Sequence, residues 1–561
     1  MTALRTPLFL LLYASLAALY VLWLQADTIG GLFGILWSDE GAYLLSAKHA
    51  TIFGVAHPFA GDRYFPEYTT PLLHRLGLLV MTPENTVWGV RLTVACAVLL
   101  AQLLLARLAY RYYGDRGEAR WCLLVLMLCP LLYFYARIGL SEGLQWLMLA
   151  LALWGLWGLF HATRLPVALG CAVAVAVLTA LLFLSKITSA AACVGLAVGV
   201  LTICFIRPRR EGLRIAAVAL ISGVLALGAI ALWFVGDAWT VWWHNNIGNH
   251  VFDENVPKTG RYLLQRLLHH YVGLHHFLTL MPVFAIGFWG LIMAADKRRG
   301  FLYLLWVVTI STLLIESLFG GELRRSFFGL GLMMLLGGFT LREWLQHGIN
   351  WQRPWPRARW LSLALVGAFL LGLLGFSYEA IMASDRIYRL LGPIFLLVIV
   401  GGAWLSGQAM RRWRYVLVGL LLLTGLLPMI FQALMAPRTT QQAVAALEAR
   451  VPAESRISGS VVPWYFVGLK RELLFLNCIP SGLAIANEPR DMPYQDTYFY
   501  LTFPELADAP PICLPPDFAQ YAPVMEFQIF FPFNKGPGYG GSRNWLWWRP
   551  FVLYKKQLVQ N

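Results

Sequence analysis

The sequence carries little charge. Only 13% of its 561 residues are Asp, Glu, Lys or Arg, whereas soluble domains average ~25%. The alternation of polar and apolar positions that is typical of membrane β-barrels is missing, and so are internal repeats and low-complexity tracts. These absences exclude an ordinary soluble protein, a membrane barrel and a repeat protein.

Familiar catalytic motifs are missing too. Zinc-finger spacing, a Walker A loop, a Gly-x-Ser-x-Gly elbow and a dinucleotide fingerprint do not occur in a suitable context. Candidate chemistry therefore rests on ionisable residues near the ends of apolar segments, where charge is expensive and tends to be functional.

Long apolar runs fill most of the chain. Hydrophobic residues make up 59% of it, and the mean hydropathy is +0.63. A helix of ~20 apolar residues crosses the hydrocarbon layer and satisfies its own backbone polar groups there. We predict a mainly α polytopic membrane protein with thirteen transmembrane helices, the first a retained anchor, at residues 7–26, 86–106, 121–136, 144–160, 167–183, 187–206, 215–236, 276–295, 301–319, 327–341, 360–377, 390–410 and 415–435.

Basic residues predict the orientation of these helices. Lys and Arg collect in alternate loops, which the positive-inside rule places in the cytoplasm: 107–120, 161–166, 207–214, 296–300, 342–359 and 411–414. This clustering explains the net charge of +15 without a nucleic-acid partner. The opposite loops, including the long 27–85 and 237–275, hold most of the acids. We expect a multi-pass protein of the inner (plasma) membrane, with a cytoplasmic N-terminus.

The chain after the last apolar run is predicted to be a separate domain. An odd number of spans places residues 436–561 outside, beyond a transmembrane domain of residues 1–435. Residues 438–451 have a helical pattern, and strand-like runs and Pro/Gly-rich loops follow, which predicts a small periplasmic α/β domain. Cys478 and Cys513 lie in it and are candidates for a disulfide. The other six cysteines, in or beside apolar runs, are predicted to be packing residues.

Two adjacent acids, Asp39 and Glu40, stand in the long first loop. They precede GAYLLSAKHA, which has the pattern of a short amphipathic helix, and acids are stabilised at a helix N-terminus. Their ordinary interpretation is a solvated loop. Their position at the membrane surface favours a catalytic role, and Tyr43, Tyr64 and Glu67 in the same loop are candidates for substrate binding.

Further ionisable residues are predicted at the same membrane face. Glu142 follows Ser141 at a helix start, where an acid is a common cap. It is also a candidate catalytic residue that, like Glu40, would orient the acceptor or carry a metal ion. Lys186 is nearly alone among apolar residues; it either snorkels to the surface or binds an anion. Arg137, Arg324 and Arg325 are further candidates for binding phosphate, since the guanidinium fork matches two oxygens.

Histidines gather in the long outer loops. With nearby acids, His57 and His250 are candidate ligands of a divalent metal ion, although no pair has a recognised ligand spacing. Histidines and tryptophans of this kind also occur as ordinary residues of the membrane interface. No other cofactor is indicated.

Carboxylates and isolated cations at one membrane face suit a lipid-borne phosphate as leaving group. The cations would hold the phosphate, and a carboxylate would deprotonate an acceptor. A sugar linked to a polyprenyl phosphate is such a donor. Two other classes stay open: a transporter or flippase of lipids or oligosaccharides, and a periplasmic polymerase or ligase that uses a pyrophosphate-linked donor.

Four segments resemble those of the GT-C superfamily of integral-membrane glycosyltransferases, above all the protein O-mannosyltransferase and lipid A aminoarabinose transferase branches: WSDEGAYLLSAKHATIFGV, RYFPEYTTPLL, YARIGLSEGL and LSKIT. The resemblance implies a polyprenyl-phosphate-sugar donor, an inverting transfer to a periplasmic lipid, glycan or protein, and contact with membrane lipids. Asp39 matches the catalytic base and Glu40 its neighbour. Glu142 matches a later acid, and Lys186 matches a lysine that contacts the donor phosphate.

The resemblance has three departures. Ala42 stands where the aminoarabinose branch has an arginine, and the segment PEYTTP lacks that branch's phosphate-binding lysine. No luminal loop is long enough for the inserted domain of the eukaryotic mannosyltransferases. The sequence therefore names neither the sugar nor the acceptor.

Overall fold

A computed structural model describes residues 6–24, 44, 47–48, 51, 70–82, 87–234, 236, 242, 277–319, 327–349, 356–367, 397–405, 409–435, 438–459, 469–470, 473–475, 498–502, 518–530 and 548–557. The chain divides into two compact units. The first unit contains residues Met1–Leu22, Val94–Ala136 and Ser141–Phe431. The second contains Trp23–Thr93, Arg137–Leu140 and Gln432–Asn561.

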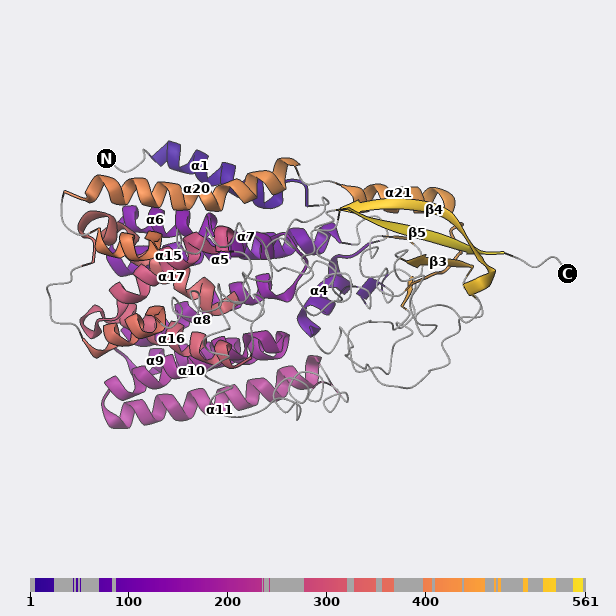
Figure 1. Cartoon of the computed structure of the whole chain (residues 1–561). Coiled ribbons are helices and arrows are strands. Elements are labelled where there is room, and N and C mark those ends of the chain that lie inside the picture. Colours follow the sequence, from indigo (N-terminus) through magenta and orange to yellow (C-terminus); the bar gives the residue numbers. More distant parts are fainter. Residues whose placement is uncertain are drawn as a thin grey trace. The chain divides into compact units, whose positions relative to one another are not determined.

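The first unit is a helical bundle (Figure 1). Its apolar runs form helices because only a helix satisfies the backbone of such a segment without water. The helices that lie wholly or mostly in it are α1 (Thr6–Val21), α5 (Trp88–Tyr113), α6 (Arg116–Met127), α7 (Pro130–Ala136), α8 (Ser141–His161), α9 (Leu165–Ser185), α10 (Ala190–Ile206), α11 (Arg209–Phe234), α15 (Phe277–Ala294), α16 (Phe301–Phe319), α17 (Phe327–His347) and α20 (Arg411–Met435), with 3₁₀ turns η3 (Ile187–Ser189) and η6 (Lys297–Arg299).

The described residues contain six helices long and apolar enough to cross a membrane, or seven if a bent pair is one span. That pair is α6 and α7, which meet at 63°. The predicted span 121–136 is therefore broken, since Pro130 lacks the N–H that would continue the helix. The helices make the chain an integral membrane protein. The count of thirteen spans stays a prediction, because parts of it fall outside the described residues.

Close contacts between helices depend on glycine. A Cβ at Gly290 of α15 would collide with the backbone of Gly337 in α17, and one at Gly195 of α10 would collide with Thr312 of α16. Small residues of this kind let membrane helices approach each other closely.

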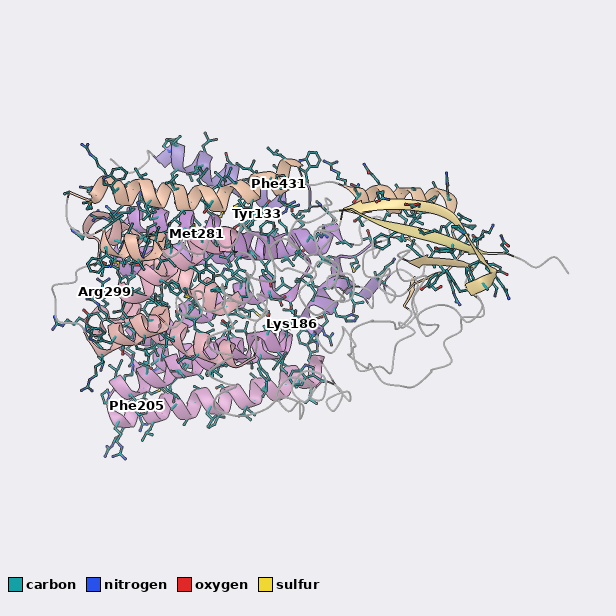
Figure 2. All side chains as sticks on the ribbon, viewed as in Figure 1. Tyr133, Lys186, Phe205, Met281, Arg299 and Phe431 are labelled. Carbon is teal, nitrogen blue, oxygen red and sulfur yellow. The ribbon has the colours of Figure 1, made fainter. Side chains whose placement is uncertain are left out.

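Polar contacts link the predicted cytoplasmic loops at one end of the bundle. The guanidinium of Arg299 bonds both carboxylate oxygens of Glu343 at 2.6 and 2.8 Å, and Arg342 pairs with Asp115. Figure 2 places Arg299 and Phe205 at this end and Lys186 at the opposite end. These contacts join three of the loops that the sequence groups as cytoplasmic, 107–120, 296–300 and 342–359. Their orientation in the membrane stays a prediction.

The second unit contains a five-stranded mixed sheet of order β2-β1-β3-β5-β4. Strand β1 is parallel to both of its neighbours, whereas β5 pairs antiparallel with β3 and β4. Helix α21 (Thr439–Arg450) packs on β4, and α4 (Pro71–Val80) also belongs to this unit. The strands are β1 (Ile457–Gly459), β2 (Leu473–Phe475), β3 (Phe499–Thr502), β4 (Tyr521–Phe530) and β5 (Trp548–Lys556). A domain boundary at residue 436 stays a prediction.

Candidate functional site

Glu142 lies in the first turn of α8, at the Lys186 end of the bundle. The helix begins at Ser141, whose Oγ lies 3.4 Å from Glu142 Oε2. An acid at this position gains from the partial positive charge of the helix N-terminus. The Glu142 side chain is fully buried, so it is more than a solvent-exposed cap.

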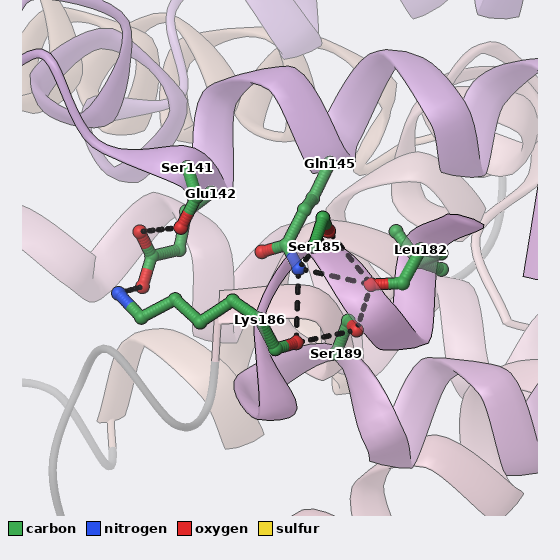
Figure 3. A network of polar contacts seen from close by, with 7 residues as sticks. All are labelled: Ser141, Glu142, Gln145, Leu182, Ser185, Lys186 and Ser189. Atoms are coloured by element: carbon green, nitrogen blue, oxygen red, sulfur yellow. Dashed lines mark hydrogen bonds and ion pairs between the residues drawn. The ribbon is translucent and has the colours of Figure 1, made fainter. Parts of the chain in front are cut away.

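Lys186 lies where the chain passes from α9 into α10. Helix α9 ends at Ser185, Lys186 is extended at φ −174° and ψ 139°, and η3 follows it. This break turns the lysine into the bundle, where 5% of the residue is exposed. Its Nζ lies 2.7 Å from Glu142 Oε1 (Figure 3). The two residues, predicted separately, thus form a buried ion pair.

Neutral hydrogen bonds hold the break in place (Figure 3). The Gln145 amide donates to Ser185 Oγ at 2.8 Å and to the carbonyls of Leu182 and Lys186 at 3.2 and 3.1 Å. The Ser189 hydroxyl lies 2.6 Å from the Leu182 carbonyl and 2.8 Å from the Lys186 carbonyl. The Leu182 carbonyl lies in the last turn of α9 and is therefore one of the groups that the ending helix leaves without an intrahelical partner.

The burial of this pair has an energetic consequence. Desolvating two charges is unfavourable, and only a close partner compensates for it. Buried ionisable groups in membrane helices are accordingly rare and tend to be functional. A ligand oxygen that approached Lys186 would find a cation already desolvated and oriented.

Arg137 belongs to the second unit. It is buried, and its Nη2 donates to the carbonyl of Trp23 at 2.9 Å. The same unit contains Arg438, which lies 4.0 Å above the Trp23 ring. Arg137 thus helps to anchor the chain after α1, a role that the sequence did not indicate.

Burial also changes the ionisation of two residues in the second unit. Lys48, fully buried, has its pKa lowered to about 7 by loss of water, although the charge of Glu448 acts in the opposite direction. His74 in α4 has its pKa lowered to about 4 by burial and by the neighbouring Arg75. The sequence did not predict the burial of either residue, because burial within a long loop leaves no pattern in the sequence.

Many predicted site residues lie outside the described part of the chain. This holds for the acids and aromatic residues of the first loop, for two arginines, for both metal-ligand candidates and for both disulfide candidates: Asp39, Glu40, Tyr43, Tyr64, Glu67, Arg324, Arg325, His57, His250, Cys478 and Cys513. Their roles stay predictions. Within the described ranges, no group of three or more His, Cys, Asp or Glu could hold a metal ion.

Gln145, Ser185 and Ser189 are site residues that the sequence analysis missed. Gln145 stands three positions after Glu142 in an otherwise apolar run, which was the available signal. The serines flank Lys186, and their contacts become visible only once α8 packs against α9.

No protein-family model and no curated protein matches the chain. Its structure is similar to ArnT from Cupriavidus metallidurans bound to undecaprenyl phosphate, with a TM-score of 0.55 at 14% identity over 99% of this chain and 98% of that one. The apo state of the same ArnT gives 0.53 at 15% identity, over 98% and 97%. An oligosaccharyltransferase from Archaeoglobus fulgidus gives 0.46 at 12% identity, over 90% and 70%.

The likeness to ArnT extends over nearly the full length of both chains. The fold is therefore that of ArnT, a lipid A aminoarabinose transferase, which is one of the two branches that the four sequence segments resemble.

Proposed function

We propose that this protein transfers a sugar from a polyprenyl-phosphate-linked donor to an acceptor at the periplasmic face of the inner membrane. The observation that carries the proposal is the buried Glu142–Lys186 pair at one end of a bundle with the ArnT fold. The structure of ArnT from Cupriavidus metallidurans contains undecaprenyl phosphate, the kind of lipid phosphate that the sequence predicts the outer cations of this chain to bind.

Lys186 is proposed to bind the donor phosphate. Its ammonium has three N–H donors, so it can keep its bond to Glu142 and donate to a phosphate oxygen as well. Glu142 orients the ammonium, and Gln145 fixes the backbone at Lys186. Arg137, Arg324 and Arg325 are proposed as further cations for the phosphate.

The proposed reaction is a single displacement. Asp39 removes the proton from an acceptor hydroxyl or amine, with Glu40 beside it, and the acceptor atom attacks the anomeric carbon of the sugar. The bond from that carbon to the phosphate oxygen breaks on the opposite face, which inverts the anomeric configuration. The departing lipid phosphate keeps the bonding electrons, and its developing charge is stabilised by Lys186.

The orientation proposed from the loop charges completes this assignment. The N-terminus lies in the cytoplasm, and the Lys186 end of the bundle and residues 436–561 lie on the periplasmic side. The sugar is a hexose or pentose, and the acceptor is a lipid, glycan or protein. Tyr43, Tyr64 and Glu67 are proposed to contact the substrate there.

Two substitutions test the proposal in purified full-length protein. Asp39→Asn should abolish sugar transfer while undecaprenyl phosphate still binds, since the base is removed and the cations remain. Lys186→Met should weaken binding of undecaprenyl phosphate. Near-normal turnover in Asp39→Asn would refute the role of Asp39 as the base. Unchanged lipid binding in Lys186→Met would refute the role of Lys186 in binding the donor phosphate. Substrate movement across proteoliposomes without a covalent product would instead indicate a transporter.

A further inference from the structure

A second buried carboxylate lies in α16. Glu316 is 1% exposed, and its Oε1 accepts a hydrogen bond from the backbone N–H of Gly329 at 2.9 Å. This N–H belongs to the first turn of α17, where four N–H groups have no partner within the helix. Glu316 therefore caps α17 from a neighbouring helix.

Gly329 provides the room for this cap. A Cβ at residue 329 would collide with Glu316 Oε2 and would lie 2.6 Å from Leu313 Cδ2. Among the described residues, Glu316 Oε2 has no hydrogen-bond partner. The missing side chain of Gly329 in α17 therefore leaves the space that the Glu316 carboxylate of α16 occupies.

The turn that Glu316 caps packs against one residue before Glu142 in the sequence and one residue after it. The Phe327 ring lies 4.6 Å from the ring of Tyr135 and 5.9 Å from that of Trp146, centroid to centroid. The Trp146 ring also fills the space beside Gly331, where a Cβ would lie 2.7 Å from it. Trp146 is one turn after Glu142 in α8, and Tyr135 precedes that helix. The first turn of α17 therefore supports the start of α8.

We propose that Glu316 is a positioning residue for the donor site. It holds the first turn of α17 against Tyr135 and Trp146, and this support fixes Glu142 and, through its ion pair, Lys186. The inference rests on the proposed function, since it assigns Glu316 a role in binding the donor phosphate through Lys186.

Binding of undecaprenyl phosphate to detergent-purified full-length protein tests this role. Glu316→Leu should raise Kd roughly tenfold, because small displacements of positioning groups weaken function strongly. Glu316→Gln should restore most of the affinity, since the amide oxygen still accepts from Gly329. Gly329→Ala should weaken binding in the same direction by displacing the carboxylate. Gly170→Ala, with nothing within 4 Å of the added carbon, is the matched control.

A double-variant cycle separates this role from a general loss of structure. If Glu316 acts through Lys186, Glu316→Leu should have no further effect on Kd in a Lys186→Met background. If Glu316→Leu raised Kd by the same factor in the parent protein and in Lys186→Met, the positioning role would be overturned and the proposed function would stand. If Lys186→Met alone leaves Kd unchanged, the proposed function fails. Glu343→Leu, which breaks the pair with Arg299 at the other end of α17, should leave Kd unchanged.

Discussion

Lys186 Nζ lies 2.7 Å from Glu142 Oε1, and both side chains are buried although 44 residues separate them in the chain. One residue comes from the start of a helix and the other from a break between two helices. The ion pair therefore ties α8 to the junction of α9 and α10, and it makes the stability of the bundle depend on two charges.

Removing one charge of this pair should destabilise the protein more than removing both. Lys186→Met leaves an uncompensated buried carboxylate, which costs ~3–5 kcal/mol in comparable cases. Thermal unfolding in detergent should show Glu142→Leu/Lys186→Met closer to the parent protein than either single variant. The double variant should nevertheless bind undecaprenyl phosphate as weakly as Lys186→Met does. Additive losses in the double variant would mean that the charges do not compensate each other.

Gln145→Leu should weaken the site without changing its charge. The substitution removes the donor to Ser185 and to the carbonyls of Leu182 and Lys186, so we expect a loss of ~1–3 kcal/mol in unfolding free energy and a higher KM for the donor. Gln102→Leu is the matched control. Its amide is equally buried and donates to Tyr20 and to the Leu126 carbonyl, so stability should fall while KM stays constant. An unchanged KM in Gln145→Leu would contradict a role at the site.

Gly290→Ala should loosen the contact between α15 and α17. The new methyl group would collide with the backbone of Gly337 and lie 2.7 Å from the carbonyl carbon of Leu336, and overpacking of this kind costs ~1–3 kcal/mol. Gly228→Ala in α11 meets nothing within 4 Å and should stabilise its helix by ~0.5–1 kcal/mol. Thermal midpoints of the two variants should move in opposite directions. If both thermal midpoints moved in the same direction, helix propensity alone would determine the effect of the two substitutions.

His74 should make the second unit sensitive to acid. Its pKa falls to about 4 in the folded protein, below the ordinary value of 6.5, so between these values the unfolded chain binds a proton that the folded chain does not. The stability from His74 is therefore complete above the ordinary value and decreases as pH falls through this window. Thermal midpoints between pH 7 and pH 4 should fall less steeply for His74→Gln. Arg75→Gln should shift the midpoint of the decrease to higher pH, because the Arg75 charge contributes to the lowered pKa. Identical pH profiles for the parent and His74→Gln would exclude the effect.

The sequence predicted the helices well and their contacts poorly. Apolar runs specify α8, α9, α10 and α16, because burial in lipid and backbone hydrogen bonding both favour a helix along each run. The 63° break before Pro130 was missed, although proline at that point was a visible signal.

The candidate site shows the same limit. Glu142 and Lys186 were predicted separately, as a cap or catalytic acid and as a snorkelling or phosphate-binding lysine, because their contact depends on how α8 packs against α9. Glu316 was hidden within an apolar run. An acid in such a segment was itself a signal, but its partner Gly329 lies in the next helix and cannot be identified from local pattern.

Helix α17 is held at both of its ends. Glu316 binds the backbone of its first turn, and Arg299 and Asp115 pair with Glu343 and Arg342 near its last turn. For spectroscopy this makes α17 the natural fixed reference of the bundle. By contrast, α11 packs mainly on α9 and leaves most of its surface uncovered by protein. Distances measured from a probe in α17 to probes in α8 or α11 would therefore record the movement of those helices alone.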